Sequence, residues 1–208
     1  MAELLLKFFV VFFVVVEPIS LIPVFAGLTE GASAGYKRKM ACKAVIIAGL
    51  ILIAFALAGG WLLNAMGISL DAFRIFGGLM LFLIALDMVF VRQSGARTTT
   101  VGEQDEVKRR EDISVFPLAF PLIAGPGALA TILLVTGDVP RASVLFAGYL
   151  AVVIIVLVIA YVMMILTPRL MKVLGLTGAN VVSRLSGVIL GALAVQFVID
   201  GLRGSFLS

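Results

Sequence analysis

The sequence FPLAFPLIAGPGALATILL, from Phe116 to Leu134, decides how this chain folds. The stretch is long and apolar enough to cross a membrane, which takes about 20 residues, but three prolines and two glycines interrupt it. Each proline lacks a backbone donor and clashes with the carbonyl four residues before it, so the helix should break. Lipid offers no partner for the freed backbone groups, and such a break persists only inside protein or beside a polar cavity. The stretch is therefore a candidate binding site.

A second interrupted run, VEPISLIPVF, lies near the N-terminus from Val16 to Phe25. Its prolines, Pro18 and Pro23, have the same spacing as Pro121 and Pro126. An arginine followed three residues later by glycine also opens a later apolar run in each half, at Arg74 and at Arg184. These matches favour a duplication with a first repeat over 1–91, a polar linker over 92–113 and a second repeat over 114–208.

The composition is that of a polytopic membrane protein. The chain has 208 residues, of which 62% are hydrophobic and 13% charged, and a soluble domain could not cover that much apolar surface. The basic residues are confined to loops, so the net charge of +4 is no sign of nucleic-acid binding. A single cysteine and the absence of histidine exclude an intramolecular disulfide, a multi-thiolate metal site and Ser-His catalysis. We expect no metal and no cofactor.

Six apolar segments can each span the membrane, so the expected fold is an all-α polytopic protein. They cover 4–28, 40–63, 73–91, 115–136, 143–166 and 185–202. Three spans per repeat is an odd number, which makes the second repeat enter the membrane from the opposite face. The prediction is two inverted three-helix repeats whose Pro/Gly-broken first and fourth segments meet near the middle of the bilayer, as in secondary transporters.

The distribution of basic residues predicts the orientation. Twelve Lys and Arg residues fall on one side of the membrane, and four fall on the other side, namely Lys7, Arg74, Arg141 and Arg203. The positive-inside rule then places both termini outside. Charge does not decide whether the first and fourth segments cross the membrane as broken spans or return as re-entrant hairpins.

The breaks themselves supply the candidate substrate site. A new helical stretch can begin at Pro23 and at Pro126, because proline suits the first turn of a helix. The first amides after each break, with the positive end of the helix dipole behind them, would suit a carboxylate. Gly125 and Gly127 would allow a ligand to approach the main chain closely, and Thr131, one turn beyond, would face the same cavity.

Two acidic residues are candidates for ion coupling. Glu17 lies within the first apolar segment, where an ionisable side chain is costly unless it is paired, protonated or facing water. It could carry a proton, unless the segment is offset and places it near an interface. Ser20 lies near the same helix face and could bond the substrate. Asp87, late in the third segment, is either an interfacial anchor or a second coupling residue.

The motif PLAFPLIAGPGA at Pro117–Ala128, together with EPISLIPVF at Glu17–Phe25, resembles the MarC family (UPF0056) of bacterial and archaeal membrane proteins. The resemblance covers nearly the whole chain. It implies a protein of the cytoplasmic membrane related to small neutral amino-acid transporters, which take glycine and alanine with a coupling cation. The family's first motif usually has Asn or Asp before its first proline and Gly three residues later, where this chain has Glu17 and Ser20.

The expected function is a secondary transporter of small neutral amino acids, coupled to H⁺ or Na⁺, and not an enzyme. Its partners would be the substrate, the coupling cation and the lipid bilayer, and the sequence permits a homo-oligomer. A multidrug or small-molecule exporter, or a passive channel, is the alternative. An intramembrane aspartyl peptidase is less favoured, because it would require two facing aspartates such as Asp87 and Asp200.

Overall fold

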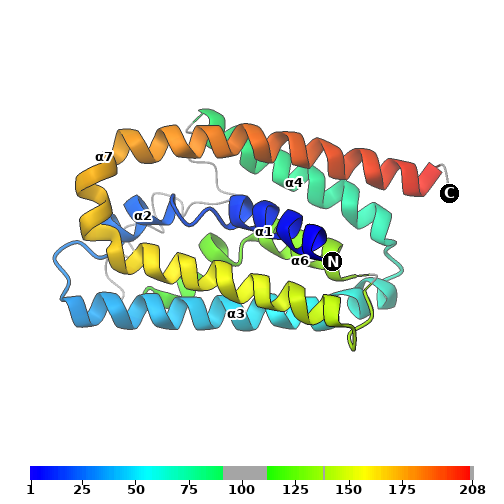
Figure 1. Cartoon of the computed structure of the whole chain (residues 1–208), viewed down its shortest axis with the longest axis horizontal. Coiled ribbons are helices and arrows are strands. Elements are labelled where there is room, and N and C mark those ends of the chain that lie inside the picture. Colours follow the sequence, from blue (N-terminus) through cyan, green and yellow to red (C-terminus); the bar gives the residue numbers. More distant parts are fainter. Residues whose placement is uncertain (91–111, 138, 207–208) are drawn as a thin grey trace.

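A computed structural model describes residues 1–90, 112–137 and 139–206, and the regular structure in these residues is entirely helical, as predicted. The predicted polar linker lies outside the described residues except for Asp112 and Ile113. The elements in chain order, shown in Figure 1, are α1 (Ala2–Val16), α2 (Leu21–Leu28), α3 (Ala34–Ala65), α4 (Leu70–Phe90), η1 (Ser114–Ile123), α6 (Pro126–Thr136) and α7 (Val144–Phe206).

The α7 segment consists of two long helices that meet at Gly175. The backbone there has φ 60° and ψ −178°, a conformation open to glycine because it has no side chain. Figure 1 shows the chain reversing direction along α7, so that its two ends lie on opposite sides of the central helices. The two parts, Val144–Val173 and Asn180–Phe206, are each long and apolar enough to cross a membrane.

The described helices provide five spans, or six when the bent pair of η1 and α6 counts as one. The other spans are Ala2–Leu28, Ala34–Ala65 and Leu70–Phe90. The N- and C-termini lie at the same end of the molecule in Figure 1, as an even number of crossings requires. The all-helical, multi-span prediction is therefore confirmed, whereas the inversion of the two halves stays a prediction.

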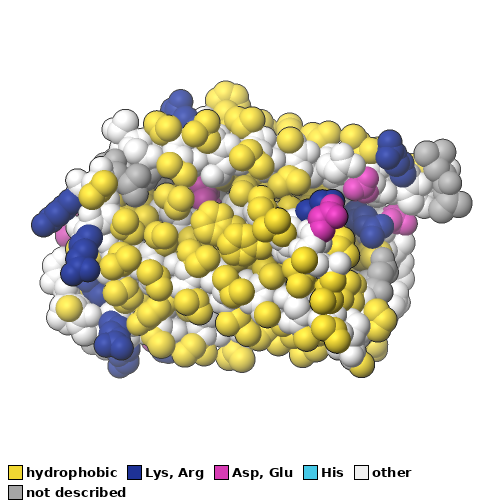
Figure 2. Space-filling model, viewed as in Figure 1, with side chains coloured by type: hydrophobic (Ala, Val, Ile, Leu, Met, Phe, Trp, Pro, Cys, Tyr) yellow, Lys and Arg dark blue, Asp and Glu magenta, His cyan; other side chains and the backbone are white. Residues whose placement is uncertain are grey.

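The surface is apolar around the middle of the molecule. Figure 2 shows hydrophobic side chains across most of one face, with Lys and Arg side chains toward its two ends. Large apolar side chains are exposed on several helices, among them Leu50 on α3, Phe76 on α4 and Val188 on α7. This distribution suits a protein whose apolar middle zone contacts lipid and whose two ends face water.

The interior is built around α1, η1 and α6, which carry the two interrupted runs. Phe12, Leu118 and Ile132, one from each of these elements, are fully buried. The α6 helix packs against α1, α3 and α4. The breaks in the chain consequently lie within protein rather than against lipid, which is the condition for their backbone groups to be satisfied.

The α4 helix and the second half of α7 run antiparallel and approach each other closely at glycines. A Cβ atom on Gly78 would lie 2.8 Å from the carbonyl oxygen of Ala194, and one on Gly187 would lie 2.8 Å from Met88 Cβ. Small residues are what allow membrane helices to pack at this distance.

Candidate functional site

The first break occupies Glu17 to Ser20. The α1 helix ends at Val16, and Glu17 adopts the left-handed conformation with φ 52° and ψ 61°. Pro18 explains why the right-handed helix ends here, because the residue before a proline avoids the right-handed helical region. Glu17 N–H still donates to the Phe13 carbonyl at 2.9 Å, and Ser20 N–H donates to the Glu17 carbonyl at 3.1 Å. The predicted interruption of the first segment is confirmed.

The chain resumes its helix at Leu21, two residues before the predicted restart at Pro23. Pro23 is half-buried and is the third residue of α2. It still lies in the first turn, where a missing N–H leaves no helical hydrogen bond unmade. The sequence argument thus placed the restart correctly to within the first turn.

The Glu17 carboxylate is buried inside the protein. The residue is 5% exposed, and its Oε1 accepts a hydrogen bond from the Ser20 hydroxyl. Pro18, between them in sequence, is also buried. The two predicted polar residues of the first break therefore form one hydrogen-bonded unit, with the αL turn bringing the Ser20 side chain back to the carboxylate.

The second break is wider than the first. In η1 the backbone of Phe116 and Phe120 is extended, and each residue precedes a cis proline. The turns are closed by bonds that span five residues, from Leu118 N–H to the Ile113 carbonyl at 3.4 Å and from Ala124 N–H to the Ala119 carbonyl at 2.8 Å. Gly125 then caps α6, which begins at Pro126 as predicted and makes a bend of 55° with η1.

A small cavity lies between the second break and the helices α1 and α4. Its volume is about 10 Å³, comparable with the space that one water molecule requires. The lining comes from α1, α4 and the second break, and consists of Val15, Ile84, Leu122, Ile123, Gly125, Pro126, Gly127 and Ala128. Three predicted site residues, Gly125, Pro126 and Gly127, are thereby brought together around one space.

Both glycines of the second break are held against neighbouring atoms. A Cβ atom on Gly125 would lie 2.4 Å from the carbonyl oxygen of Pro121. One on Gly127 would lie 2.9 Å from Leu81 Cδ2 and 3.3 Å from Val15 Cγ1. Val15 lies in the last turn of α1, two residues before Glu17, so this contact joins the end of α1 to the second break.

The N-terminus of α6 offers backbone donors at the cavity. Its helical hydrogen bonds begin with Leu129 N–H, which donates to the Gly125 carbonyl at 3.0 Å. Pro126 has no N–H, and the amides of Gly127 and Ala128 precede the first helical bond. These amides carry the positive end of the helix dipole, an environment suited to an anion.

The other predicted residues lie outside the cavity lining, including Glu17, Pro18, Ser20 and Pro23 of the first broken segment. Thr131 is buried one turn along α6, and its hydroxyl donates to the Gly127 carbonyl at 2.8 Å. Pro121 is half-buried in η1, and its carbonyl faces Gly125. Asp87 is half-buried on α4, one turn after Ile84, which lines the cavity.

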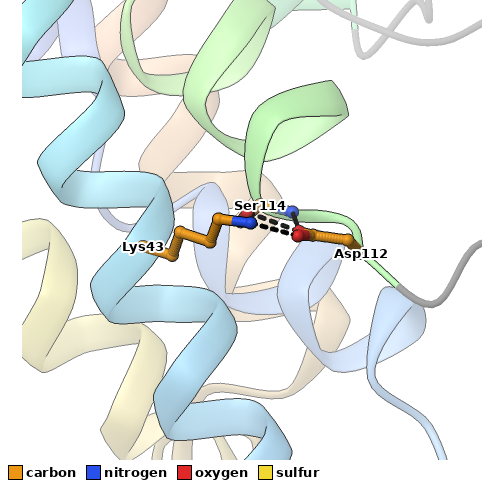
Figure 3. Close-up of polar contacts among 3 residues, drawn as sticks. All are labelled: Lys43, Asp112 and Ser114. Carbon is orange, nitrogen blue, oxygen red and sulfur yellow. Dashed lines mark hydrogen bonds and ion pairs between the residues drawn. The ribbon is translucent and has the colours of Figure 1, made fainter.

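The sequence did not predict that Val15 and Ile84 line the cavity. Both are apolar residues in apolar helices, and only the tertiary contact distinguishes them from their neighbours. A second feature was also missed, a polar cluster that fixes the start of the second break (Figure 3). Asp112 accepts hydrogen bonds from Lys43 on α3, from the Ser114 hydroxyl and, at 3.0 Å, from Ser114 N–H.

The Lys43–Asp112 cluster ties η1 to α3 at the end of the molecule that carries most of the described basic residues. The hydrogen bond from Lys43 and the two from Ser114 lower the pKa of Asp112 to about 2. Asp112 is therefore ionised at neutral pH. Its aspartate side chain anchors the point at which the broken segment leaves the aqueous surface.

Comparison with known families supports the resemblance of the two proline motifs to those of the MarC family. The family model described as MarC family integral membrane protein matches residues 2–206. The chain belongs to the MarC family. Relatives of this MarC protein include UPF0056 membrane proteins of Aquifex aeolicus, 37% identical over 96% of this chain and 92% of the relative, and of Methanocaldococcus jannaschii, 36% identical over 94% of each.

The UPF0056 membrane protein YhcE of Escherichia coli is 34% identical over 96% of this MarC chain and 92% of the relative. No solved structure matches the chain significantly. The names of these relatives describe membrane proteins and assign no substrate. The protein is thus an integral, multi-pass membrane protein of the MarC family.

Proposed function

We propose that this MarC protein is a secondary transporter of small neutral amino acids of the cytoplasmic membrane, with both termini outside. The observation that carries the proposal is the contact of two broken segments within the protein, with Val15 of the first against Gly127 of the second. Broken helices at a repeat interface are the means by which secondary transporters build substrate sites.

The chemistry of the second break favours a small zwitterion. The amides of Gly127 and Ala128 at the start of α6 would hold a carboxylate, as helix N-termini hold anions. Glycines in close contact with their neighbours leave room for a small side chain only. Main-chain carbonyls at the breaks would hold the ammonium group or a cation.

Glu17 is the proposed coupling residue, with Asp87 as the second candidate. A buried carboxylate within an apolar segment is a functional candidate by default, and Glu17 has a hydroxyl partner in Ser20. Protonation or cation binding would change that hydrogen bond and the charge of the first break together. This is how a proton or Na⁺ could be coupled to rearrangement of the helices.

The cavity of about 10 Å³ is smaller than any amino acid, so substrate binding requires the breaks to separate. Inverted repeats would supply such a motion, since exchange of conformation between two related halves opens the site to alternate sides.

The other functions considered have less support. An exporter of bulky drugs would need an aromatic-lined cavity, whereas the lining at the breaks consists of Val, Ile, Leu, Pro, Gly and Ala side chains. An aspartyl peptidase would need two facing aspartates. Asp200 accepts a hydrogen bond from Gln196 at 2.8 Å, and its neighbour Gly201 lies against Asp71, at the opposite end of α4 from Asp87.

The test is uptake of labelled alanine and glycine into proteoliposomes containing the purified protein. We expect saturable uptake driven by an inward gradient of H⁺ or Na⁺, and competition between the two amino acids. Liposomes without protein and a large substrate such as tryptophan serve as controls. A folded, correctly inserted protein that moves neither amino acid under either gradient would contradict the proposal.

A further inference from the structure

A second cavity lies at the end of the molecule where α3 begins and α7 turns, on the left in Figure 1. Its volume is about 240 Å³, and it shares no lining residue with the cavity at the breaks. It is bounded by the end of α2, the start of α3 and the part of α7 that precedes Arg169. Its size suits a small polar head or a length of hydrocarbon chain rather than a helix of a partner protein.

One wall of this cavity is apolar. Phe25 and Met164 are each 1% exposed, Ile165 is 36% exposed, and Pro168 completes the surface. The wall therefore runs from the interior of the protein to its outside. An apolar chain lying along it would be continuous with the lipid-facing surface of α7.

The cavity lining also includes two positively charged residues, Lys37 and Arg38, on the first turns of α3. The ion pairs found among residues 1–90, 112–137 and 139–206 involve neither of them. Two cations of this kind attract a phosphate, to which arginine can present a planar fork and lysine a point charge.

The hydroxyl groups of the two threonines in the lining donate hydrogen bonds to backbone carbonyls. Thr29 donates to the Phe25 carbonyl at 2.7 Å, and Thr167 donates to the Met163 carbonyl at 3.1 Å. Polar recognition of a ligand must therefore come from the two cations. A zwitterionic amino acid has no apolar tail to fill the wall, so the cavity suits a different ligand from the one proposed for the breaks.

We infer that this cavity binds an anionic phospholipid, with the phosphate between Lys37 and Arg38 and an acyl chain along Phe25, Met164 and Ile165. Basic pockets between membrane helices on the cytoplasmic side are suited to anionic head groups. Free inorganic phosphate shares the chemistry of the head group, but it would leave the apolar wall unfilled. The inference rests on the membrane orientation proposed above, but not on the proposed transport activity.

The experiment is a titration of the purified full-length protein with phosphatidylglycerol, read as bound lipid by native mass spectrometry. Phosphatidylcholine of the same chain length is the neutral control. Lys37→Gln with Arg38→Gln should weaken phosphatidylglycerol binding about 30-fold, the loss expected for two cations near a membrane surface. The charge-conserving pair Lys37→Arg with Arg38→Lys should retain most of the binding.

The matched control is Lys39→Gln with Lys172→Gln, which removes the same charge from exposed positions outside the cavity lining. An equal loss in this control would overturn the inference in favour of general surface attraction. Equal binding of phosphatidylcholine would also overturn it, as would displacement of the lipid by inorganic phosphate at a similar concentration. The single variants Lys37→Gln and Arg38→Gln, each with about half the effect in free energy, serve if the double variant does not fold.

Discussion

At the scale of single residues, the glycines of the second break differ in how much space surrounds them. The nearest obstacle to a Cβ on Gly125 is a backbone oxygen, that of Pro121 at 2.4 Å. The nearest obstacle at Gly127 is Leu81 Cδ2 at 2.9 Å, the end of a flexible side chain. A backbone oxygen cannot move without the turn that carries it, whereas a leucine methyl can.

We therefore expect Gly125→Ala to destabilise the protein by about 1–3 kcal/mol, the usual cost of overpacking, and Gly127→Ala to cost less. Thermal unfolding in detergent measures both. Gly35→Ala is the control, because the nearest atom to its Cβ is Ser33 Oγ at 4.0 Å and alanine favours a helix. A Gly125→Ala protein as stable as wild type would contradict this account of the break.

The Glu17 carboxylate allows the coupling proposal to be tested separately from folding. Glu17→Gln keeps an oxygen that can accept the Ser20 hydroxyl but cannot carry a proton between the two sides. We expect uptake driven by a proton gradient to fall at least about tenfold, as for loss of a proton-transfer group, while exchange of alanine across the membrane continues. Unchanged gradient-driven uptake would exclude Glu17 as the proton carrier.

Asp112 gives the clearest pH dependence. Its folded pKa, about 2, lies below the ordinary value of 3.8, so its ionised form stabilises the fold above pH 3.8. This contribution is lost as the pH falls from 3.8 toward 2. The side chains of the Lys43–Asp112 pair are 46% and 43% exposed, which limits the effect to below about 1 kcal/mol.

The difference in unfolding temperature between wild type and Asp112→Asn should accordingly be present at pH 6 and vanish near pH 2. Glu3→Gln provides a control, because its ion pair with Lys7 lies at the surface within a single helix. A difference that persists at pH 2 would show that Asp112 acts by some means other than its charge.

At the scale of elements, Arg141 joins the end of α6 to the C-terminal half of α3. Its Nη1 donates to the Thr136 and Val139 carbonyls at 2.8 and 3.1 Å, and its Nε donates to the Leu57 carbonyl at 3.3 Å. The guanidinium also lies 5.2 Å from the centre of the Phe146 ring. One side chain thereby fixes the turn that follows the broken segment.

Arg141→Ala should lower stability by about 1–2 kcal/mol, because several charge-assisted hydrogen bonds are lost. Arg141→Lys should retain only part of this stability, since an ammonium group cannot reproduce the planar set of donors of a guanidinium. Arg203→Ala, an exposed position near the C-terminus, is the control for loss of charge. The unfolding temperatures of the three variants, measured under one detergent condition, test this prediction. Equal losses of stability for all three would contradict the stabilising role of the Arg141 hydrogen bonds.

At the scale of the whole molecule, the orientation in the membrane is the main prediction from charge that awaits measurement. The two ends of α3 carry exposed positions, Glu30 just before the helix and Met66 just after it. In a background with Cys42→Ser, which removes the only cysteine, we expect Glu30→Cys to react with a membrane-impermeant thiol reagent from the cytoplasmic side only. Met66→Cys should react from the outside only, and the opposite pattern would invert the orientation.

Much of the fold followed from the sequence, because span length and helix breaking are local properties. Apolar runs of membrane length gave the spans, and Pro18 and Pro126 gave the interruptions. The restart of α2 at Leu21 rather than Pro23 depends on the αL turn at Glu17, which composition does not specify.

The cavity at the breaks could be predicted only in part. Gly125, Pro126 and Gly127 stand out in the sequence, whereas Val15 and Ile84 gain their role from packing between distant segments. The contact of Lys43 with Asp112, 69 residues apart in sequence, likewise depends on tertiary structure. The inverted relation of the two repeats remains a prediction.

The close contact of α4 with the second half of α7 limits which pairs of helices can slide against each other. A Cβ atom at Gly78, Gly187 or Gly201 would lie 2.8 to 3.0 Å from a backbone oxygen of the facing helix, so the two helix backbones approach closely at all three positions. We expect these two helices to move together as one unit. Enlargement of the space beside Gly127 then requires these helices to slide against α1 and α6. Leucine, isoleucine and valine side chains at that contact can repack by changing their rotamers.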